Sequence, residues 1–194
     1  MTKIIGLTGG IGSGKTMVAE YIKSLGILVY IADDEARELM NTAKVIQSIS
    51  AAFGKEVVDN GILNRDKLAK IVFNNPEKLQ KLNNIVHPEV KKHFDIWVEK
   101  HKNYPFVVKE AAILFESGSY KYCDAVITVT SPLETRLQRV INRDKTDRES
   151  VLKRMQNQWT DEQRIAKSDY VIHNLSVDGT KRQVDEILNL LKNQ

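Results

Sequence analysis

The sequence contains too little cysteine for a structure held together by disulfides or by cysteine-bound metal. Cys123 is the only cysteine among 194 residues, so neither an internal disulfide nor a cysteine metal cluster can form. The position of Cys123 beside the apolar run 125–129 indicates a structural thiol. We therefore expect no redox chemistry.

Long hydrophobic runs are absent as well. No uninterrupted apolar stretch approaches the roughly 20 residues that cross a bilayer. No basic segment, apolar signal core or cleavage site stands between Met1 and the first expected strand, so no signal peptide is predicted. We expect a cytoplasmic protein with no membrane span and no membrane partner.

Charge of one sign is not in large excess. The formal net charge is +4, which is modest for a nucleic-acid-binding protein and equally suits an enzyme that acts on phosphorylated substrates. In the densest basic stretch, 91–102, Phe94, Trp97 and Val98 repeat at helical spacing and form an expected buried stripe. The lysines between them are therefore expected on a solvated helix face. We expect no nucleic-acid partner, and a monomer or a weak homo-oligomer.

A phosphate-binding motif is present near the N-terminus. Residues 9–16 are Gly-Gly-Ile-Gly-Ser-Gly-Lys-Thr, which matches G-x-x-x-x-G-K-[ST] at every fixed position. The apolar run 3–8 comes before this segment, and Val18, Ile22 and Leu25 follow it at helical spacing, so strand, glycine loop and helix occur in the required order. The motif in this setting predicts a site for the phosphates of a nucleotide.

The chemistry of the motif assigns roles to its residues. Glycine lets successive backbone N–H groups face a phosphate, Lys15 carries a positive charge toward the β- and γ-phosphates, and Thr16 offers a hydroxyl to Mg²⁺. We therefore expect ATP and Mg²⁺ as cofactors, with Thr16 as the metal-binding residue. The expected nucleotide-binding residues of this segment are Gly10, Gly12, Ser13, Gly14, Lys15, Thr16 and Met17.

Short apolar strands alternate with helices along most of the chain. This alternation predicts an α/β fold, the three-layer P-loop NTPase fold, with a parallel sheet covered by helices. Gly26 stands where a helix C-cap belongs and is expected to end the first helix. The closing helix has a buried face made of Val184, Ile187, Leu188 and Leu191. The expected strands are 3–8, 27–31, 106–109, 125–129 and 170–173.

A helical insertion interrupts this alternation within the single domain 1–194. Residues 34–102 follow a wholly helical pattern. Within the insertion, Asn75-Pro76 and His87-Pro88 are expected as helix starts, because proline suits the first helical turn and disfavours helix in the residue before it. The core of the domain then comprises 1–33, 103–143 and 165–194.

A predicted lid, residues 144–164, follows a helix rich in arginine. Ser131 to Glu134 matches a capping box with proline at the first helical position, and a second capping box is expected at Thr146 to Glu149. The lid segment is polar and suits a mobile element. The arginines that share one flank of the helix before it are Arg136, Arg139 and Arg143.

Phosphoryl transfer depends mainly on positioning and electrostatic stabilisation, so the sequence must supply suitable groups. Asp33 follows the strand 27–31 at the sheet edge where ligands usually bind, and we expect it to orient or deprotonate the acceptor hydroxyl. An N-cap role for Asp33 is compatible with this function. Arg139 and Arg143 are candidate transition-state cations, whereas a solvated basic edge is an equal alternative for Arg136. The expected catalytic residues are Asp33, Lys15, Arg139 and Arg143.

Nearly the whole chain resembles the dephospho-coenzyme A kinase family. The opening, 5–15, is similar to the start of that family, and Ile31-Ala32-Asp33 through Ala36-Arg37 is similar to its D-A-D…A-R segment. Two further segments in the middle of the chain are similar to family motifs: Ile85-Val86-His87-Pro88 resembles the H-P motif, and residues 113–118 resemble P-L-L-F-E-S-G. Two more lie toward the C-terminus: Arg139 through Arg143-Asp144 resembles the lid-side arginines, and residues 168–174 resemble A-D-x-V-I-x-N.

The resemblance implies an activity and a set of roles. The activity is ATP-dependent phosphorylation of the ribose 3′-hydroxyl of dephospho-coenzyme A, the final step of coenzyme A biosynthesis, by a core, an acceptor-binding insertion and a lid. In this scheme Asp33 activates the hydroxyl. The acceptor is bound by Asp33, Arg37 and Glu116, and Asn174 lies near the adenine end. The resemblance also implies a place near the acceptor for His87. Surface pairing for Arg37 and Glu116, a turn position for Asn174 and a helix cap for His87 stay open as alternatives.

Two departures from the family pattern and three rival functions remain. Ile31 replaces the first aspartate of D-A-D, which removes any Mg²⁺ role for that position, and Ala112 replaces the proline of P-L-L. A P-loop kinase of another small molecule or nucleotide is the nearest alternative, because one fold serves many acceptors. A GTP-driven switch usually carries N-K-x-D, which this sequence lacks, and a non-catalytic ATP-binding module would leave Asp33 and the lid arginines without a purpose.

Overall fold

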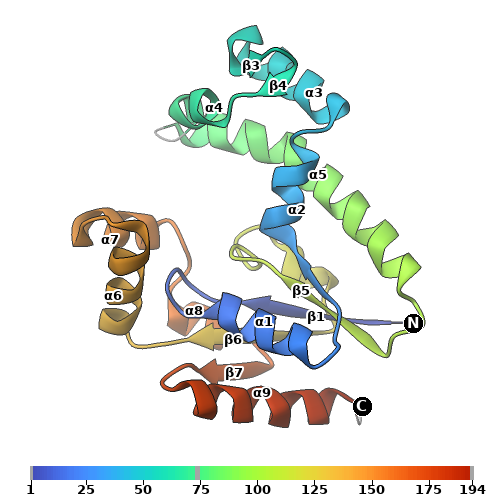
Figure 1. Ribbon diagram of the computed structural model, residues 1–194, viewed down its shortest axis with the longest axis vertical. Helices are drawn as coiled ribbons and strands as arrows, with labels where there is room; N and C mark the ends of the chain where they lie inside the picture. The colour runs from blue at the N-terminus through green and yellow to red at the C-terminus, as the bar shows by residue number, and fades with distance from the viewer. Residues whose placement is uncertain (1, 73–74, 193–194) are drawn as a thin grey trace. The chain divides into compact units, whose positions relative to one another are not determined.

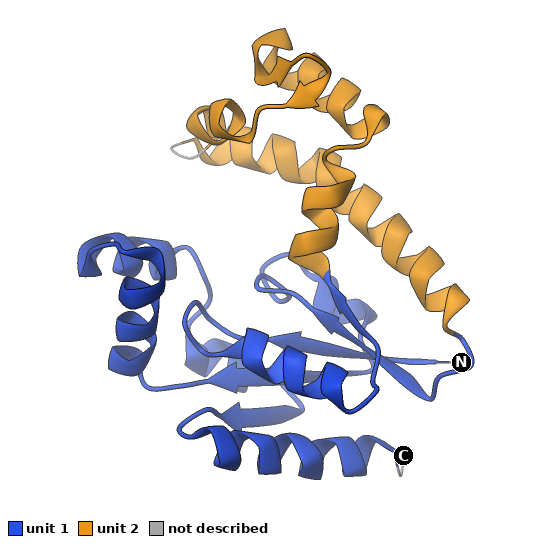
Figure 2. Cartoon of the chain, in the orientation of Figure 1, with its two compact units in different colours: residues 1–31, 102–194 blue, residues 32–101 orange. Residues whose placement is uncertain are grey.

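The computed structural model describes residues 2–72 and 75–192 and consists of two compact units. One unit comprises residues 1–31 and 102–194, and the other comprises residues 32–101 (Figure 2). Each unit has its own cluster of buried apolar side chains. None of the helices in the described residues is long and apolar enough to cross a membrane.

The larger unit is built on a parallel sheet with the strand order β2-β5-β1-β6-β7 (Figure 1). The strands are β1 (Lys3–Thr8), β2 (Val29–Ile31), β5 (Phe106–Glu110), β6 (Ala125–Thr130) and β7 (Tyr170–His173). In the central strand, Leu7 is in register with Glu110 on one side and Ile127 on the other. The predicted α/β fold with a parallel sheet is therefore confirmed, although β2 begins at Val29 and not at residue 27.

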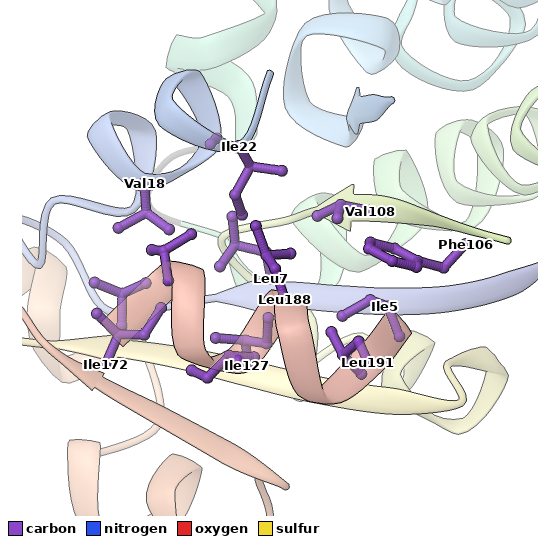
Figure 3. Close-up of a cluster of buried hydrophobic side chains, with 14 residues drawn as sticks. Ile5, Leu7, Val18, Ile22, Phe106, Val108, Ile127, Ile172, Leu188 and Leu191 are labelled. Carbon is purple, nitrogen blue, oxygen red and sulfur yellow. The ribbon is translucent and has the colours of Figure 1, made fainter. Parts of the chain in front are cut away.

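Helices α1 (Lys15–Ser24) and α9 (Val177–Lys192) pack against the sheet through one shared core (Figure 3). Val18 and Ile22 of α1 are fully buried in it together with Leu7 of β1, and burial of each such side chain contributes about 1.5–3 kcal/mol. Gly26, with a φ of 79°, donates its N–H to the carbonyl of Lys23 and ends α1 as predicted. This packing fixes the orientation of α1 at the carboxyl end of β1.

The other side of β1 packs tightly around Cys123. Because side chains alternate along a strand, Gly6 faces away from Leu7, and a Cβ on Gly6 would lie 2.7 Å from Leu114 and 3.1 Å from the sulfur of Cys123. Burial raises the pKa of the Cys123 thiol to about 11. A thiol that stays protonated in a packed site has the character of a structural group.

Both predicted capping boxes are wrong. Helix α6 (Leu133–Asp144) begins without a side-chain cap, because the Ser131 hydroxyl donates to the carbonyl of Asn174 at 2.9 Å instead. Helix α7 (Arg148–Gln156) is capped by Asp147, which accepts from the N–H of Ser150 at 2.8 Å and lies one residue beyond the expected Thr146. A true capping box begins helix α8 (Asp161–Ile165), formed by Thr160 and Gln163.

The smaller unit is not wholly helical as predicted. A two-stranded antiparallel hairpin joins β3 (Val58–Asp59) to β4 (Ile62–Leu63), next to the 3₁₀ helix η1 (Lys55–Val57). The turn residues Asn60 and Gly61 both have positive φ, 51° and 79°, and Asn-Gly is a strong sequence signal for such a turn. The helices of this unit are α2 (Ala32–Leu39), α3 (Ala43–Phe53), α4 (Arg65–Val72) and α5 (Pro76–Lys100).

Helix α5 confirms one predicted start and overturns the other. Asn75 accepts the N–H of Lys78 at 2.9 Å, and Pro76 occupies the first turn. The start predicted at His87-Pro88 is wrong, because α5 continues through Pro88. An internal proline costs about 3 kcal/mol or more in an isolated helix, and here the helix keeps a buried stripe on both sides of it, made of Val86, Val90 and Phe94.

Candidate active site

The phosphate loop, residues 9–14, joins β1 to α1. Gly12 and Gly14 have φ values of 79° and 93°, in the left-handed region that favours glycine. A Cβ on Gly12 would collide with the backbone of Arg136, and one on Gly14 would collide with the side-chain amide of Asn174. Both the conformation and the available space therefore require glycine at these two positions.

Two side chains hold carbonyl groups on the outside of the phosphate loop. Asn174 donates from Nδ2 to the carbonyl of Ser13 at 2.8 Å, and Arg139 donates from Nη1 to the carbonyls of Gly12 and Ser13 at 3.3 Å each. In a trans peptide the C=O and the following N–H point in opposite directions, so the N–H of Gly14 faces away from Asn174. Inward N–H groups are what a bound phosphate requires.

Asn174 is itself held in a fixed orientation. Its side chain is buried, with Oδ1 accepting from the hydroxyl of Thr180 at 3.0 Å. Its backbone carbonyl accepts from the Ser131 hydroxyl at 2.9 Å and from Nη2 of Arg139 at 3.3 Å. The sequence gave no signal of this role for Ser131 or Thr180, because the role comes from the packing of β6, β7 and α9 around the loop.

The lysine of the motif pairs with a carboxylate that the sequence did not indicate. Nζ of Lys15 forms an ion pair with Glu110, a residue that is 3% exposed at the end of β5. The register places Glu110 beside Leu7 of β1 and beside Ile31 of β2. An acidic residue at the end of a predicted core strand is the signal that could have revealed it.

The site offers oxygen ligands of the kind that Mg²⁺ prefers. Thr16 lies exposed in the first turn of α1, and Glu110 supplies a carboxylate at the neighbouring strand end. Mg²⁺ needs few protein ligands, because it keeps several waters and binds substrate phosphates. The donor set therefore fits a Mg²⁺ ion bound together with ATP.

The three arginines of the α6 flank have different surroundings. Arg136 is 8% exposed, donates from Nε to the carbonyl of Ile11 at 2.9 Å and pairs with Asp161 at 2.8 Å, so the alternative of a solvated edge is wrong for it. Arg139 contacts the phosphate loop as described above. Arg143 is exposed at the end of α6 and pairs with Asp144 at 2.7 Å, so the structure does not bring it to the loop with the other two.

Glu116 has an anchoring contact that the sequence did not predict. Its Oε1 accepts from the N–H of Trp159 at 2.9 Å and from Nη2 of Arg164 at 2.8 Å. Arg164 is completely buried, and burial lowers the pKa of its guanidinium. The Phe115 ring stacks on Trp159 with centroids 5.3 Å apart. The end of the predicted lid is thus fixed to the segment after β5.

Asp33, Arg37 and His87 belong to the smaller unit. Asp33 is in the first turn of α2, two residues after β2 ends at Ile31. Arg37 is exposed and pairs with Asp34 at 2.7 Å. His87 lies inside α5, so the open alternative of a helix cap for this residue is wrong.

The geometry defines a class of protein. A parallel sheet carries a complete G-x-x-x-x-G-K-T loop between its central strand and the following helix, with lysine, arginine and asparagine side chains gathered around it. These are the features of P-loop phosphotransferases that use ATP.

Comparison with known proteins narrows the class. The dephospho-CoA kinase family model matches residues 3–178. A dephospho-CoA kinase of Fusobacterium nucleatum is 44% identical over 174 residues, which cover 89% of this chain and 90% of that protein. One from Bacteroides fragilis is 36% identical over 188 residues, 96% of this chain and 90% of that protein. The chain belongs to the dephospho-CoA kinase family.

Solved structures agree with this assignment. A crystal structure of a Thermus thermophilus protein superposes with a TM-score of 0.87 at 32% identity, covering 97% of each chain. A dephospho-CoA kinase from Campylobacter jejuni gives a TM-score of 0.73 at 26% identity, covering 100% of this chain and 99% of that chain. A shikimate kinase from Acinetobacter baumannii, 16% identical with a TM-score of 0.58 and covering 100% of this chain and 96% of that chain, shares the fold alone.

Proposed function

We propose that the chain transfers the γ-phosphoryl group of ATP to the ribose 3′-hydroxyl of dephospho-coenzyme A, giving coenzyme A and ADP in the last step of coenzyme A biosynthesis. The observation that carries the proposal is the complete phosphate loop, held from outside by Asn174 and Arg139, in a chain that belongs to this family.

The phosphate loop and its cations account for the ATP side of the reaction. Backbone N–H groups bind the phosphates, and the ammonium of Lys15 stabilises the charge that spreads over the γ-phosphoryl oxygens. Arg139 adds positive charge behind the loop, whose outward carbonyls it holds. Glu110 holds Nζ of Lys15 at the carboxyl end of the sheet. We also propose that Arg143 assists from the lid side, as the family resemblance implies.

Mg²⁺ belongs to the proposal as well. Thr16 and Glu110 would hold the ion, which supplies charge neutralisation between the β- and γ-phosphates when ATP is bound. Glu110 lies in register beside Ile31, so this end of the sheet has a carboxylate even though Ile31 has replaced the first aspartate of the family pattern.

We assign the acceptor side to the helical insertion. Asp33 is the residue that orients or deprotonates the ribose hydroxyl, because it follows β2 directly in the chain and a carboxylate is a suitable general base. Arg37 and Glu116 are proposed to bind dephospho-coenzyme A, and Asn174 to lie near the adenine of ATP. A cytoplasmic location and a monomeric or weakly homo-oligomeric state stay predictions from the sequence.

An ADP-release assay with a panel of acceptors tests the proposal. The panel contains dephospho-coenzyme A, nucleoside monophosphates and shikimate, and we expect ADP release that depends on dephospho-coenzyme A and on Mg²⁺. Turnover with another acceptor but not with dephospho-coenzyme A would overturn the assigned acceptor. Absence of turnover with every acceptor, in a chain that binds ATP, would favour the binding-module alternative.

A further inference from the structure

Both polar groups of the Ile11 backbone are held by side chains from distant parts of the chain. The N–H of Ile11 donates to Oε1 of Gln158 at 3.0 Å, and the carbonyl of Ile11 accepts from Nε of Arg136 at 2.9 Å. Ile11 lies between Gly10 and Gly12 in the phosphate loop, where glycine leaves the backbone free to rotate. The two side chains therefore supply the order that the local sequence lacks.

Gln158 is well placed to restrain the loop because its own backbone is fixed. Its N–H donates to the carbonyl of Met155 at the end of α7. The next residue, Trp159, stacks on Phe115 and donates its N–H to Glu116. Gln158 therefore projects from a segment anchored on both sides.

Arg136, the second side chain that bonds to Ile11, also contacts the segment that follows Gln158. Arg136 pairs with Asp161 at 2.8 Å, and Asp161 is the first residue of α8 and accepts from the hydroxyl of Thr130. Arg164 of the same helix also approaches Asp161, at 3.5 Å. The connection between α7 and α8 and the arginine of α6 thus hold the two peptide groups on either side of Ile11.

We propose that Gln158 is a positioning residue for the phosphates of ATP, acting through the backbone N–H of Ile11 in the phosphate loop. Because Gln158 accepts the N–H of Ile11, this part of the loop is held in place. The N–H groups of the residues after Ile11 then remain available to face the phosphates. The inference rests on ATP binding in the proposed function. It adds that the segment after α7 sets the shape of the loop and with it the affinity for nucleotide.

Three variants of the full chain separate this role from a general effect on stability. Gln158→Leu keeps the side-chain size and removes the acceptor, Gln158→Glu keeps an acceptor at the same reach, and Gln158→Asn keeps the amide but shortens the side chain. Gln138→Leu is the matched control, because Gln138 is exposed on α6 and bonds to Asn142 of its own helix.

Binding of a non-hydrolysable ATP analogue and amide hydrogen exchange at Ile11 are the readouts. We expect Gln158→Leu and Gln158→Asn to weaken nucleotide binding about tenfold, the usual effect of one lost hydrogen bond, and to speed exchange of the Ile11 N–H. Gln158→Glu and Gln138→Leu should stay within about threefold of the wild type. Affinity for dephospho-coenzyme A should not change.

Several outcomes would overturn the inference. They are wild-type nucleotide affinity in both Gln158→Leu and Gln158→Asn, binding by Gln158→Glu as weak as by Gln158→Leu, unchanged exchange of the Ile11 N–H, or an equal loss of affinity for both ligands. These readouts need no turnover, so a wild-type chain that fails to phosphorylate dephospho-coenzyme A would contradict the proposed function and leave the role of Gln158 measurable.

Discussion

Asn174 donates its side-chain amide to the carbonyl of Ser13 at 2.8 Å, across 161 positions of sequence. The contact joins the end of β7 to the phosphate loop, and the carbonyl of Ser13, which can only accept, requires the NH₂ end of the amide to face it. This single hydrogen bond connects the last part of the larger unit to the first.

Replacement of the Asn174 amide by a carboxylate should disturb the loop. In Asn174→Asp, an oxygen would face the carbonyl oxygen of Ser13, so we expect ATP affinity to fall at least about tenfold. Nucleotide titration measures the effect. Asn142→Asp introduces the same charge at an exposed position of α6 and should bind ATP like the wild type. Equal affinities in the two variants would contradict the role of the Asn174 amide.

Removal of the proposed base should affect chemistry more than ATP binding. We expect Asp33→Asn to reduce kcat at least about a hundredfold, the usual contribution of general-base assistance, with ATP affinity nearly intact. Steady-state kinetics and nucleotide titration measure both quantities. Asp66→Asn is the control, because Asp66 lies in the first turn of another helix, α4. Turnover of Asp33→Asn at the wild-type rate would remove Asp33 from the mechanism.

Loss of the motif lysine should reduce both function and stability. Lys15→Ala removes a phosphate-binding charge and leaves Glu110, which is 3% exposed, without its ammonium partner. We expect weaker ATP binding, slower turnover and a free energy of unfolding lower by about 3 kcal/mol. Urea denaturation of Lys15→Ala combined with Glu110→Gln should show recovered stability without recovered ATP binding. A double variant as unstable as the single one would contradict the ion pair as the cause.

One substitution at Glu116 tests both its predicted role in acceptor binding and its observed contact with Arg164. Glu116→Ala removes the nearer of two carboxylates from the buried guanidinium of Arg164 and leaves Asp161 at 3.5 Å. We expect the free energy of unfolding to fall by about 3 kcal/mol. Urea denaturation measures this loss. The KM for dephospho-coenzyme A in the folded variant tests the acceptor role, and an unchanged value would contradict it.

Stability in acid should depend on Asp144. Two hydrogen bonds, the stronger effect from Arg143 and the weaker from Arg154, lower the pKa of this carboxyl from 3.8 to about 2 in the folded chain. A depressed pKa favours the folded state above pH 3.8, and this contribution is lost as the pH falls toward 2. We expect Asp144→Asn to show a smaller decrease in stability between pH 5 and pH 2 than the wild type, measured by urea denaturation at each pH. Parallel profiles would contradict this assignment.

Elements that depend only on residues close together in the sequence were predicted correctly. The apolar run of β1, the glycine loop and Gly26 needed only neighbouring residues, and their positions agree with the structure. The start at His87-Pro88 failed because proline propensity was overridden by the continuous buried stripe of α5. The box at Ser131 failed because its hydroxyl found a tertiary partner, the carbonyl of Asn174, that lies far away in sequence.

The sequence by itself determined that a phosphate loop follows a buried strand, that the fold is α/β and that the chain resembles one kinase family. These follow from spacing, backbone freedom and residue type within short segments. Tertiary structure alone decided that Asn174, Arg139, Arg136 and Gln158 hold the loop, and that Glu110 faces Lys15. A hydrogen bond or ion pair requires atoms within a few ångströms, and only the folded chain brings residues so far apart in the sequence to that distance.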